Sequence, residues 1–189
     1  MNRLTMSLAG IVIAAAVLGG CASTPIESSG PNAPRVELER VEVASYFGYA
    51  PPPARVPLVL AFVFNVTNPT RGTVTLDELK FTYSFEGKPG EFFPLNTPTA
   101  YETMHIPANT SNQIRVVSVL DSLIVPGTLA VTSGFRVQAL GLKGSDVVKM
   151  WWEKIGDFEY KIKVSEGTAM FSGPGGNAVV TFESIFPKK

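Results

Sequence analysis

The chain has few of the residues from which catalytic and metal sites are usually built. Its 189 residues include one cysteine, Cys21, and one histidine, His105. Zinc sites in proteins use three or four ligands, so counting excludes a His/Cys metal site. We therefore expect neither a metal nor a cofactor.

The chain also lacks an excess of charge and long helix-forming runs. Sixteen Lys and Arg residues balance sixteen Asp and Glu residues. This balance argues against nucleic acid as a partner and against electrostatic binding to anionic lipid head groups. Gly and Pro are abundant, with 17 and 15 residues, and runs rich in Ala, Glu, Lys and Leu are missing after the N-terminal segment. Such a composition is typical of a β-rich protein.

No catalytic constellation is visible in the sequence. An enzyme needs a nucleophile with a base, a metal cluster or a positioned carboxylate pair. His105 has no partner in the pattern, and we interpret it as a solvated or core-edge residue. Asp77 and Glu78 are adjacent, and neighbours on an extended chain point in opposite directions. These two carboxylates therefore cannot act together as a catalytic pair. The glycine-rich stretch 172–176 lacks the lysine and the helix of a phosphate loop, so we interpret it as a hairpin turn. We expect that the protein is not an enzyme.

The one long apolar run lies at the N-terminus and ends at the cysteine. Arg3 precedes the run, which extends from Met6 to Val17, and Leu18-Gly19-Gly20-Cys21 follows it. This order is typical of a signal peptide, and the run is shorter than the about 20 residues of a spanning helix. The stretch 18–21 resembles the lipobox of bacterial lipoproteins. The alternatives are an ordinary secretory signal with a chance cysteine, or a single transmembrane anchor.

The lipobox resemblance implies a membrane anchor. It implies that residues 1–20 form a signal peptide, that the Gly20–Cys21 bond is cut and that Cys21 carries acyl chains. Two or three chains on one residue give stable attachment, whereas one chain alone binds marginally. Ala22 in place of Asp after the cysteine implies transfer to the outer membrane, facing the periplasm. Residues 21–34, rich in Ser, Pro and Gly, are predicted to form a flexible tether.

Period-two alternation of apolar residues predicts a mainly β domain over residues 35–187. The clearest alternation lies at Leu79–Phe85 and Phe158–Val164. The segment Val56–Val66 is apolar on both faces, which indicates a central strand. Less complete alternation predicts further strands at Val36–Tyr46, Glu91–Leu95, Tyr101–Ile106, Ile114–Leu120, Leu129–Leu140 and Val179–Phe186.

Local signals refine this pattern at two strands. The apolar parity of the first strand switches between Leu38 and Val41, which predicts a bulge or a break. Pro69 cannot donate a ladder hydrogen bond and so ends the strand before it. Asn68 can close an Asx-turn there with its side chain.

One short helix is predicted between the strands. Ser145 can cap it, and Asp146 suits its positive end. Val148, Trp151, Trp152 and Ile155 share the helical period, and Gly156 can end the helix in the left-handed conformation. Together these elements predict an antiparallel β-sandwich, immunoglobulin/fibronectin-like, of about seven strands with one short helix.

The region 36–120 resembles the WHy (water stress and hypersensitive response) domain of the late embryogenesis abundant type 2 family. Three stretches carry the resemblance: an apolar strand running into Asn65–Pro69, then Leu76–Tyr83, and the turn Ile106–Thr110 before the next strand. The short helix and closing strands also match the family's order, whereas residues 122–144 fit least well. The resemblance implies a folded, non-enzymatic domain that protects proteins or membranes during water loss.

Trp151 and Trp152 are the one feature that could form a contact surface. Adjacent helical residues point about 100° apart, so burying both requires a broad apolar face. Either the two indoles seal one end of the sandwich, or they form a patch for an envelope protein or a membrane interface. We expect one buried and one exposed indole. The patch and the tether leave open a second function, as an envelope adaptor or a lipid- or protein-binding module.

Overall fold

The computed structural model describes residues 25–188, and these form a mainly β structure with antiparallel sheets. Nine strands and two helices follow one another along this part of the chain. The first sheet has the order β1-β2-β7, with β1 at Arg35–Tyr46, β2 at Pro57–Asn68 and β7 at Thr110–Asp121. The second sheet has the order β4-β3-β8-β9, and two short strands also pair with β3. Its strands are β3 (Val74–Lys88), β4 (Glu91–Asn96), β5 (Thr99–Ala100), β6 (Met104–Ile106), β8 (Ile162–Gly173) and β9 (Gly176–Phe186).

The two sheets face each other across an aromatic core. Phe62 and Phe64 of β2 lie against Phe81 of β3, with ring centroids 5.0 and 4.9 Å apart in edge-to-face geometry. Phe64 also meets Phe182 of β9 at 5.4 Å. All four side chains are buried. Burial of such large rings is the main source of stability in a structure of this kind.

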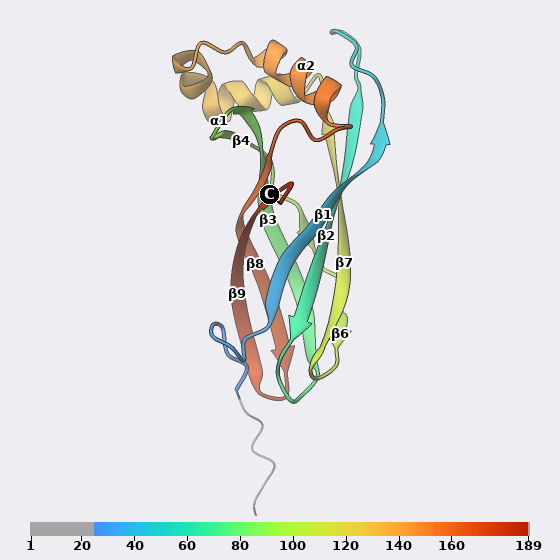
Figure 1. Cartoon of the computed structure of the whole chain (residues 1–189), viewed down its shortest axis with the longest axis vertical. Helices are drawn as coiled ribbons and strands as arrows, with labels where there is room; N and C mark the ends of the chain where they lie inside the picture. The colour runs from blue at the N-terminus through green and yellow to red at the C-terminus, as the bar shows by residue number, and fades with distance from the viewer. Residues whose placement is uncertain (1–24, 189) are drawn as a thin grey trace, which may run out of the picture.

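The long axis of the molecule follows the strands (Figure 1). The helices α1 (Val125–Ala139) and α2 (Gly144–Lys154) lie together at one end. The first described residues lie at the opposite end (Figure 1). Strands of twelve residues span about 40 Å, which sets the separation of the two ends.

Several predictions for the first sheet are confirmed. The register of β1 against β2 shifts between Leu38 and Arg40, where the apolar parity switches. β2 is the central strand, and its outward-facing Ala61 and Val63 are buried, as are the inward-facing residues.

The folded part of the chain begins earlier than the sequence predicts. Residues 25–34 belong to the predicted tether, yet Ala33 and Pro34 are buried and Ile26 packs against the core. The backbone turns here, because the amide of Ala33 donates to the carbonyl of Gly30. Cys21, Gly20 and the rest of residues 1–24 lie outside the described residues.

The region before the predicted helix is where the sequence analysis is wrong. Leu129–Leu140 is predicted as a strand but forms most of α1. Pro126 occupies the first turn of this helix, where proline is favoured. The described residues therefore contain two helices rather than one, and nine strands rather than about seven.

The predicted helix exists as α2, but its ends differ from the prediction. Its N-cap residue is Lys143, and Ser145 makes no capping hydrogen bond. The residue with positive φ after the helix is Phe158 rather than Gly156. Because Phe158 leaves the extended conformation, β8 begins at Ile162, four residues later than predicted.

A buried asparagine joins the two sheets at the end away from the helices. Asn68 ends β2, and the amide of Thr70 donates to its Oδ1 at 2.9 Å, which confirms the predicted Asx-turn. Its Nδ2 reaches across to three carbonyl oxygens, of Gly72 at 2.8 Å, Ile106 at 2.9 Å and Pro107 at 3.1 Å. The chain passes from one sheet to the other after β2 and again after β6. One side chain thus ties both crossings together.

Replacing Asn68 by Asp should test this joint. The carboxylate keeps the acceptor of the Asx-turn but turns an oxygen toward three carbonyl oxygens. We expect the free energy of unfolding in urea to fall by about 3 kcal/mol or more, because a buried charge then faces unpaired acceptors. The matched control is Asn177→Asp at an exposed position of β9, which should cost within about 0.5 kcal/mol. Equal costs for the two variants would contradict the role assigned to Asn68.

Candidate functional site

The two tryptophans Trp151 and Trp152 are both core residues, so the expectation of one exposed indole is wrong, and they seal one end of the sandwich instead of forming a contact patch. Both side chains are 0% exposed. The Nε1 of Trp151 donates to the carbonyl of Glu86 at 2.8 Å, and the Nε1 of Trp152 donates to the carbonyl of Val56 at 3.2 Å. Glu86 belongs to the second sheet, whereas Val56 directly precedes β2 of the first sheet. The adjacent indoles therefore close the helical end of the sandwich by bonding to both sheets.

The polar residues considered from the sequence do not form a reaction centre. His105 is exposed on β6, and its Nδ1 lies 2.9 Å from the hydroxyl of Thr75 on the paired strand β3. Asp77 and Glu78 are half-buried neighbours on β3. Within residues 25–188 no three His, Cys, Asp or Glu side chains lie close enough to hold a metal ion. The stretch 172–176 forms the turn between β8 and β9, as predicted.

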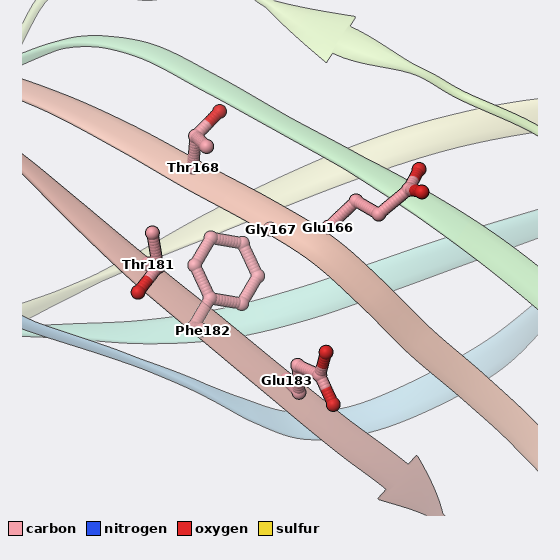
Figure 2. A pocket seen from close by; sticks show the side chains of 6 residues that line it. All are labelled: Glu166, Gly167, Thr168, Thr181, Phe182 and Glu183. Atoms are coloured by element: carbon pink, nitrogen blue, oxygen red, sulfur yellow. The ribbon is translucent and has the colours of Figure 1, made fainter.

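A shallow hollow lies over a bulge in β8 (Figure 2). The register between β8 and β9 shifts between Val164 and Gly167, and Glu166 adopts a positive φ of 52°. The ring of Phe182 covers Gly167, where a Cβ atom would lie 2.6 Å from the ring. The carboxylate of Glu166 accepts a hydrogen bond from the hydroxyl of Thr82 at 2.8 Å. The hollow is therefore explained by the bulge and by the close approach of an aromatic ring to glycine.

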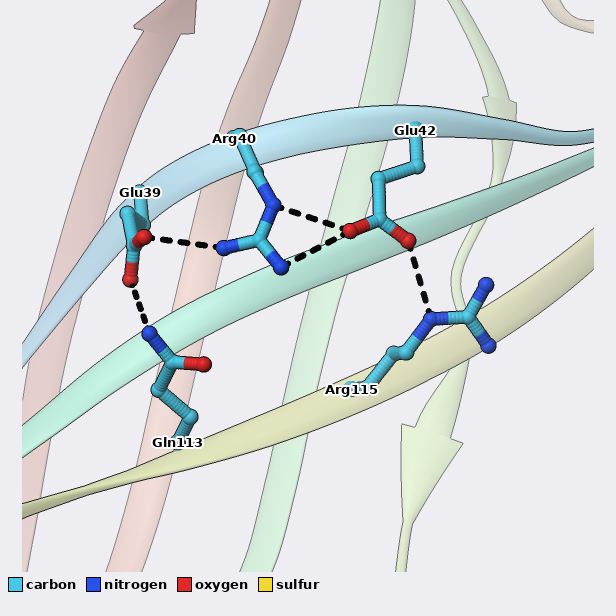
Figure 3. Close-up of polar contacts among 5 residues, drawn as sticks. All are labelled: Glu39, Arg40, Glu42, Gln113 and Arg115. Atoms are coloured by element: carbon cyan, nitrogen blue, oxygen red, sulfur yellow. Dashed lines mark hydrogen bonds and ion pairs between the residues drawn. The ribbon is translucent and has the colours of Figure 1, made fainter.

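Charged side chains form a cluster on the outer face of the first sheet (Figure 3). Arg40 binds Glu39 and Glu42, each at 2.8 Å, and Arg115 binds the second oxygen of Glu42 at 3.0 Å. Gln113 donates to Glu39. The hydrogen bonds from Arg115 and Arg40 hold the pKa of Glu42 below its ordinary value. Exposed ion pairs of this kind contribute little to stability.

The position of this cluster gives it a structural role. Arg40 and Arg115 are the strand neighbours of Val63, and Glu42 is the neighbour of Ala61. The long charged side chains can cover the apolar outer face of β2 with their stems. The cluster explains why outward-facing residues of β2 are buried, and it needs no ligand.

The helical end carries the surface that sequence reasoning missed. The side chains of Ile124, Val131 and Phe135 are 56%, 88% and 94% exposed. Leu123 beside them is 42% exposed. We call these four residues the α1 ridge. The signal in the sequence was Pro126, because proline is common in the first turn of a helix. A helix that starts there places Val131 and Phe135 on one face.

α1 is held firmly to the rest of the molecule. Val125, Leu129 and Val137 on its other face are buried in the core. Arg136 binds the carboxylate of Glu91 and donates to the carbonyl of Phe92 at 3.0 Å, both in β4. Its guanidinium lies 5.2 Å from the ring centre of Phe93. The ridge is therefore presented on a fixed support.

A groove of about 560 Å³ runs beside the ridge, between the two helices. Its lining is mostly apolar or small, and includes Leu129, Ala130, Gly134, Val137 and Leu142. No helix of the described residues is long and apolar enough to cross a membrane. The helical end thus combines an apolar ridge with an apolar groove.

Comparison with known proteins indicates the fold. No protein-family model matches the chain, and no curated protein matches it. The solution structure of AT1g01470 from Arabidopsis thaliana matches with a TM-score of 0.51 and 11% identity, over 87% of this chain and 84% of that one. The X-ray structure of the structural genomics target SoR45 matches with a TM-score of 0.42 and 15% identity, over 83% and 88% of the two chains. A crystal structure of a protein from Archaeoglobus fulgidus matches with a TM-score of 0.38 and 14% identity, over 81% of this chain and 98% of that one. The Arabidopsis likeness supports a shared fold and carries no functional information.

Truncating either tryptophan should destabilise the protein strongly. Trp151→Ala and Trp152→Ala each leave a cavity and an unpaired carbonyl, so we expect each to cost about 3–5 kcal/mol in urea unfolding. The matched control is Phe135→Ala on the neighbouring helix, which should cost within about 0.5 kcal/mol because that ring is exposed. A small cost at either tryptophan would contradict its place in the core.

Alkaline unfolding should report on a second polar link inside the core. The hydroxyl of Tyr83 on β3 lies 2.9 Å from that of Ser118 on β7, and burial raises the pKa of Tyr83 to about 12. The neutral phenol is the form that suits the folded state. The contribution of Tyr83 to the free energy of unfolding is therefore fully present below pH 10, the ordinary pKa of a tyrosine, and is lost as the pH rises toward 12.

Tyr83→Phe removes this titration. We expect a loss of about 1 kcal/mol at neutral pH from the missing hydrogen bond, and a shallower fall in stability between pH 10 and pH 12. Urea unfolding across this pH range measures both effects. Burial also raises the pKa of Tyr160, so part of the alkaline loss should remain in the variant. An unchanged pH profile would contradict the assignment.

Proposed function

We propose that this protein is a lipid-anchored component of the bacterial cell envelope that protects against desiccation or other water stress without catalysing a reaction. In this proposal, acyl chains on Cys21 hold it at the outer membrane, facing the periplasm. Its domain is a WHy-like, immunoglobulin/fibronectin-like sandwich with additional short strands and a second helix. Its clients are envelope proteins or lipids.

The observation that best supports a WHy-like domain is the position of the residues that carry the resemblance. The stretch ending at Asn68-Pro69 and the turn starting at Ile106 are far apart in the sequence. In the fold they meet, because the buried side chain of Asn68 binds the carbonyl groups of Ile106 and Pro107. The resemblance therefore follows residues that make one joint, which is a reason to regard it as more than a chance pattern of apolar residues.

The internal hydrogen bonding supports a role during water loss. Among the described residues, every buried side-chain nitrogen or oxygen atom has a hydrogen-bond partner. Asn68, Tyr83 and both indoles find their partners within the protein. Buried groups that rely on water for a partner would lose it on drying, at a cost of about 1–3 kcal/mol each. A domain satisfied from within is suited to stay folded when water is scarce.

A second candidate function is that of an envelope adaptor or a lipid- or protein-binding module. The exposed α1 ridge favours it, because surface helices of monomeric proteins normally turn polar residues to the solvent. The two candidates differ in what the cell needs from the protein: survival of drying in one, and envelope assembly under ordinary conditions in the other.

Membrane fractionation of the wild type and of Cys21→Ser tests the anchor. We expect the wild type in the membrane fraction with acyl mass on Cys21, and the variant in the soluble fraction. Ser7→Ala within the signal segment is the matched control and should fractionate as the wild type does. A wild-type protein without acyl mass, or a variant that stays on the membrane, would show that the anchor is wrong.

A deletion strain tests the role in water stress. We expect survival after drying or osmotic shock to fall, and to be restored by the wild type but not by the poorly folded Asn68→Asp variant at equal expression. Asn177→Asp should restore survival. If the deletion strain survives drying as well as the parent but shows an envelope defect in normal medium, the adaptor function replaces the stress function.

A further inference from the structure

The helix α1 is apolar on two opposite faces. Val125, Leu129 and Val137 face the core, whereas Val131 and Phe135 face solvent almost completely. A helix on the surface of a soluble protein usually presents charged and polar residues outward. The outer face of α1 is therefore suited to contact an apolar surface.

The residues of the α1 ridge form a narrow stripe. At 100° per residue, Ile124, Val131 and Phe135 fall within about 40° of one another around the helix axis. Leu123 adjoins the start of the stripe. Such alignment gives one continuous apolar edge at the end of the molecule rather than scattered exposed residues.

The charges around the ridge favour a lipid surface as its occupant. The segment 122–143 contains no Asp or Glu, and its two charged residues, Arg136 and Lys143, are both basic. Arg136 is already bound to Glu91, which leaves its charge partly balanced. Asp121, directly before this segment, is paired with Arg55, and its carboxylate also accepts a hydrogen bond from the amide of Leu123. An apolar stripe whose flanking acidic residues are paired with arginine suits a helix that lies in the interface of a bilayer.

We propose that α1 is an interfacial membrane-binding helix, with Ile124, Val131 and Phe135 inserted between the lipid head groups. Four apolar side chains give only a weak and reversible contact by themselves. Together with an anchor on Cys21, which belongs to the proposed function, the contact becomes intramolecular and a weak ridge suffices.

The location of the ridge adds a consequence for orientation. Pro25, the first described residue, lies beside Pro69 and Thr70 after β2, and the first described residues lie at the end of the molecule opposite to α1 (Figure 1). Three residues lie between Cys21 and Pro25 in the sequence, so the Cα atoms of these two residues can be at most about 14 Å apart. If both ends contact one membrane, the sandwich lies along the bilayer instead of standing on it.

Vesicle binding of the chain from Ala22 onward tests the helix without the anchor. This chain keeps all described residues and hence the whole core. With vesicles of phosphatidylglycerol and phosphatidylethanolamine, we expect measurable partition that falls at least about tenfold in the double variant Val131→Ser, Phe135→Ser. The matched control is Met170→Ser, an exposed apolar residue on β8, and its partition should equal that of the wild type. Unchanged melting temperatures would show that all three proteins are folded.

A spectroscopic variant gives an independent measurement. Phe135→Trp adds one exposed indole to two buried ones, so a blue shift of its emission on adding vesicles reports insertion of the ridge. Absence of partition by the wild type, equal loss in the Met170 control, or no blue shift would overturn the proposal. A dimer in solution that the double variant dissolves would also overturn it, because a second copy would then cover the ridge. These outcomes are independent of Cys21, so they leave the anchor to its own experiment.

Discussion

The fold depends on one buried amide, that of Asn68, at the end of the molecule away from the helices. The chain crosses between the sheets after β2 and after β6, and the two crossings run side by side between the paired ends of β2 and β7 and of β3 and β6. The Asn68 side chain adds a buried connection between the crossings, because its oxygen closes the turn that follows β2 while its nitrogen binds carbonyl groups at the end of β6. Only an amide offers an acceptor and two donors at such close positions. With the crossings fixed, the inner faces of β2 and β3 meet in register and their aromatic rings interlock.

At the opposite end, the two sheets are joined by indole N–H groups instead of an amide. There α2 lies over the open end of the core, and its two adjacent indoles donate to carbonyl groups of different sheets. Two neighbouring residues on a helix diverge by about 100°, and this divergence lets the two indoles reach carbonyl groups on different sides of the core. The angle that raised the expectation of one exposed indole therefore serves to bury both. α2 and the clamp between Arg136 and β4 in turn give α1 a rigid base.

The sequence predicts those features that follow from local rules. The bulge in β1, the central place of β2 and the Asx-turn at Asn68 each depend on a few neighbouring residues. Two of the three carbonyl partners of the Asn68 nitrogen, Ile106 and Pro107, are 38 and 39 positions away, so no local pattern reveals them. The burial of Trp151 and Trp152 depends on where two sheets end relative to a helix, which is a property of the whole fold. The hollow at Gly167 likewise requires knowledge of which ring on β9 lies opposite.

The failure at residues 129–140 has a more specific cause. Leu129, Val131, Phe135 and Val137 alternate as strand residues do, because apolar residues on the outer face of α1 fill the gaps between those on its inner face. If the outer face of α1 were polar, its apolar residues would follow the helical period and the sequence would predict a helix. A segment in which local pattern and final structure conflict is expected at a functional or strained site. The misleading alternation and the exposed α1 ridge are thus one observation, and the residues that hide the helix from the sequence are those that give its outer face an affinity for an apolar surface.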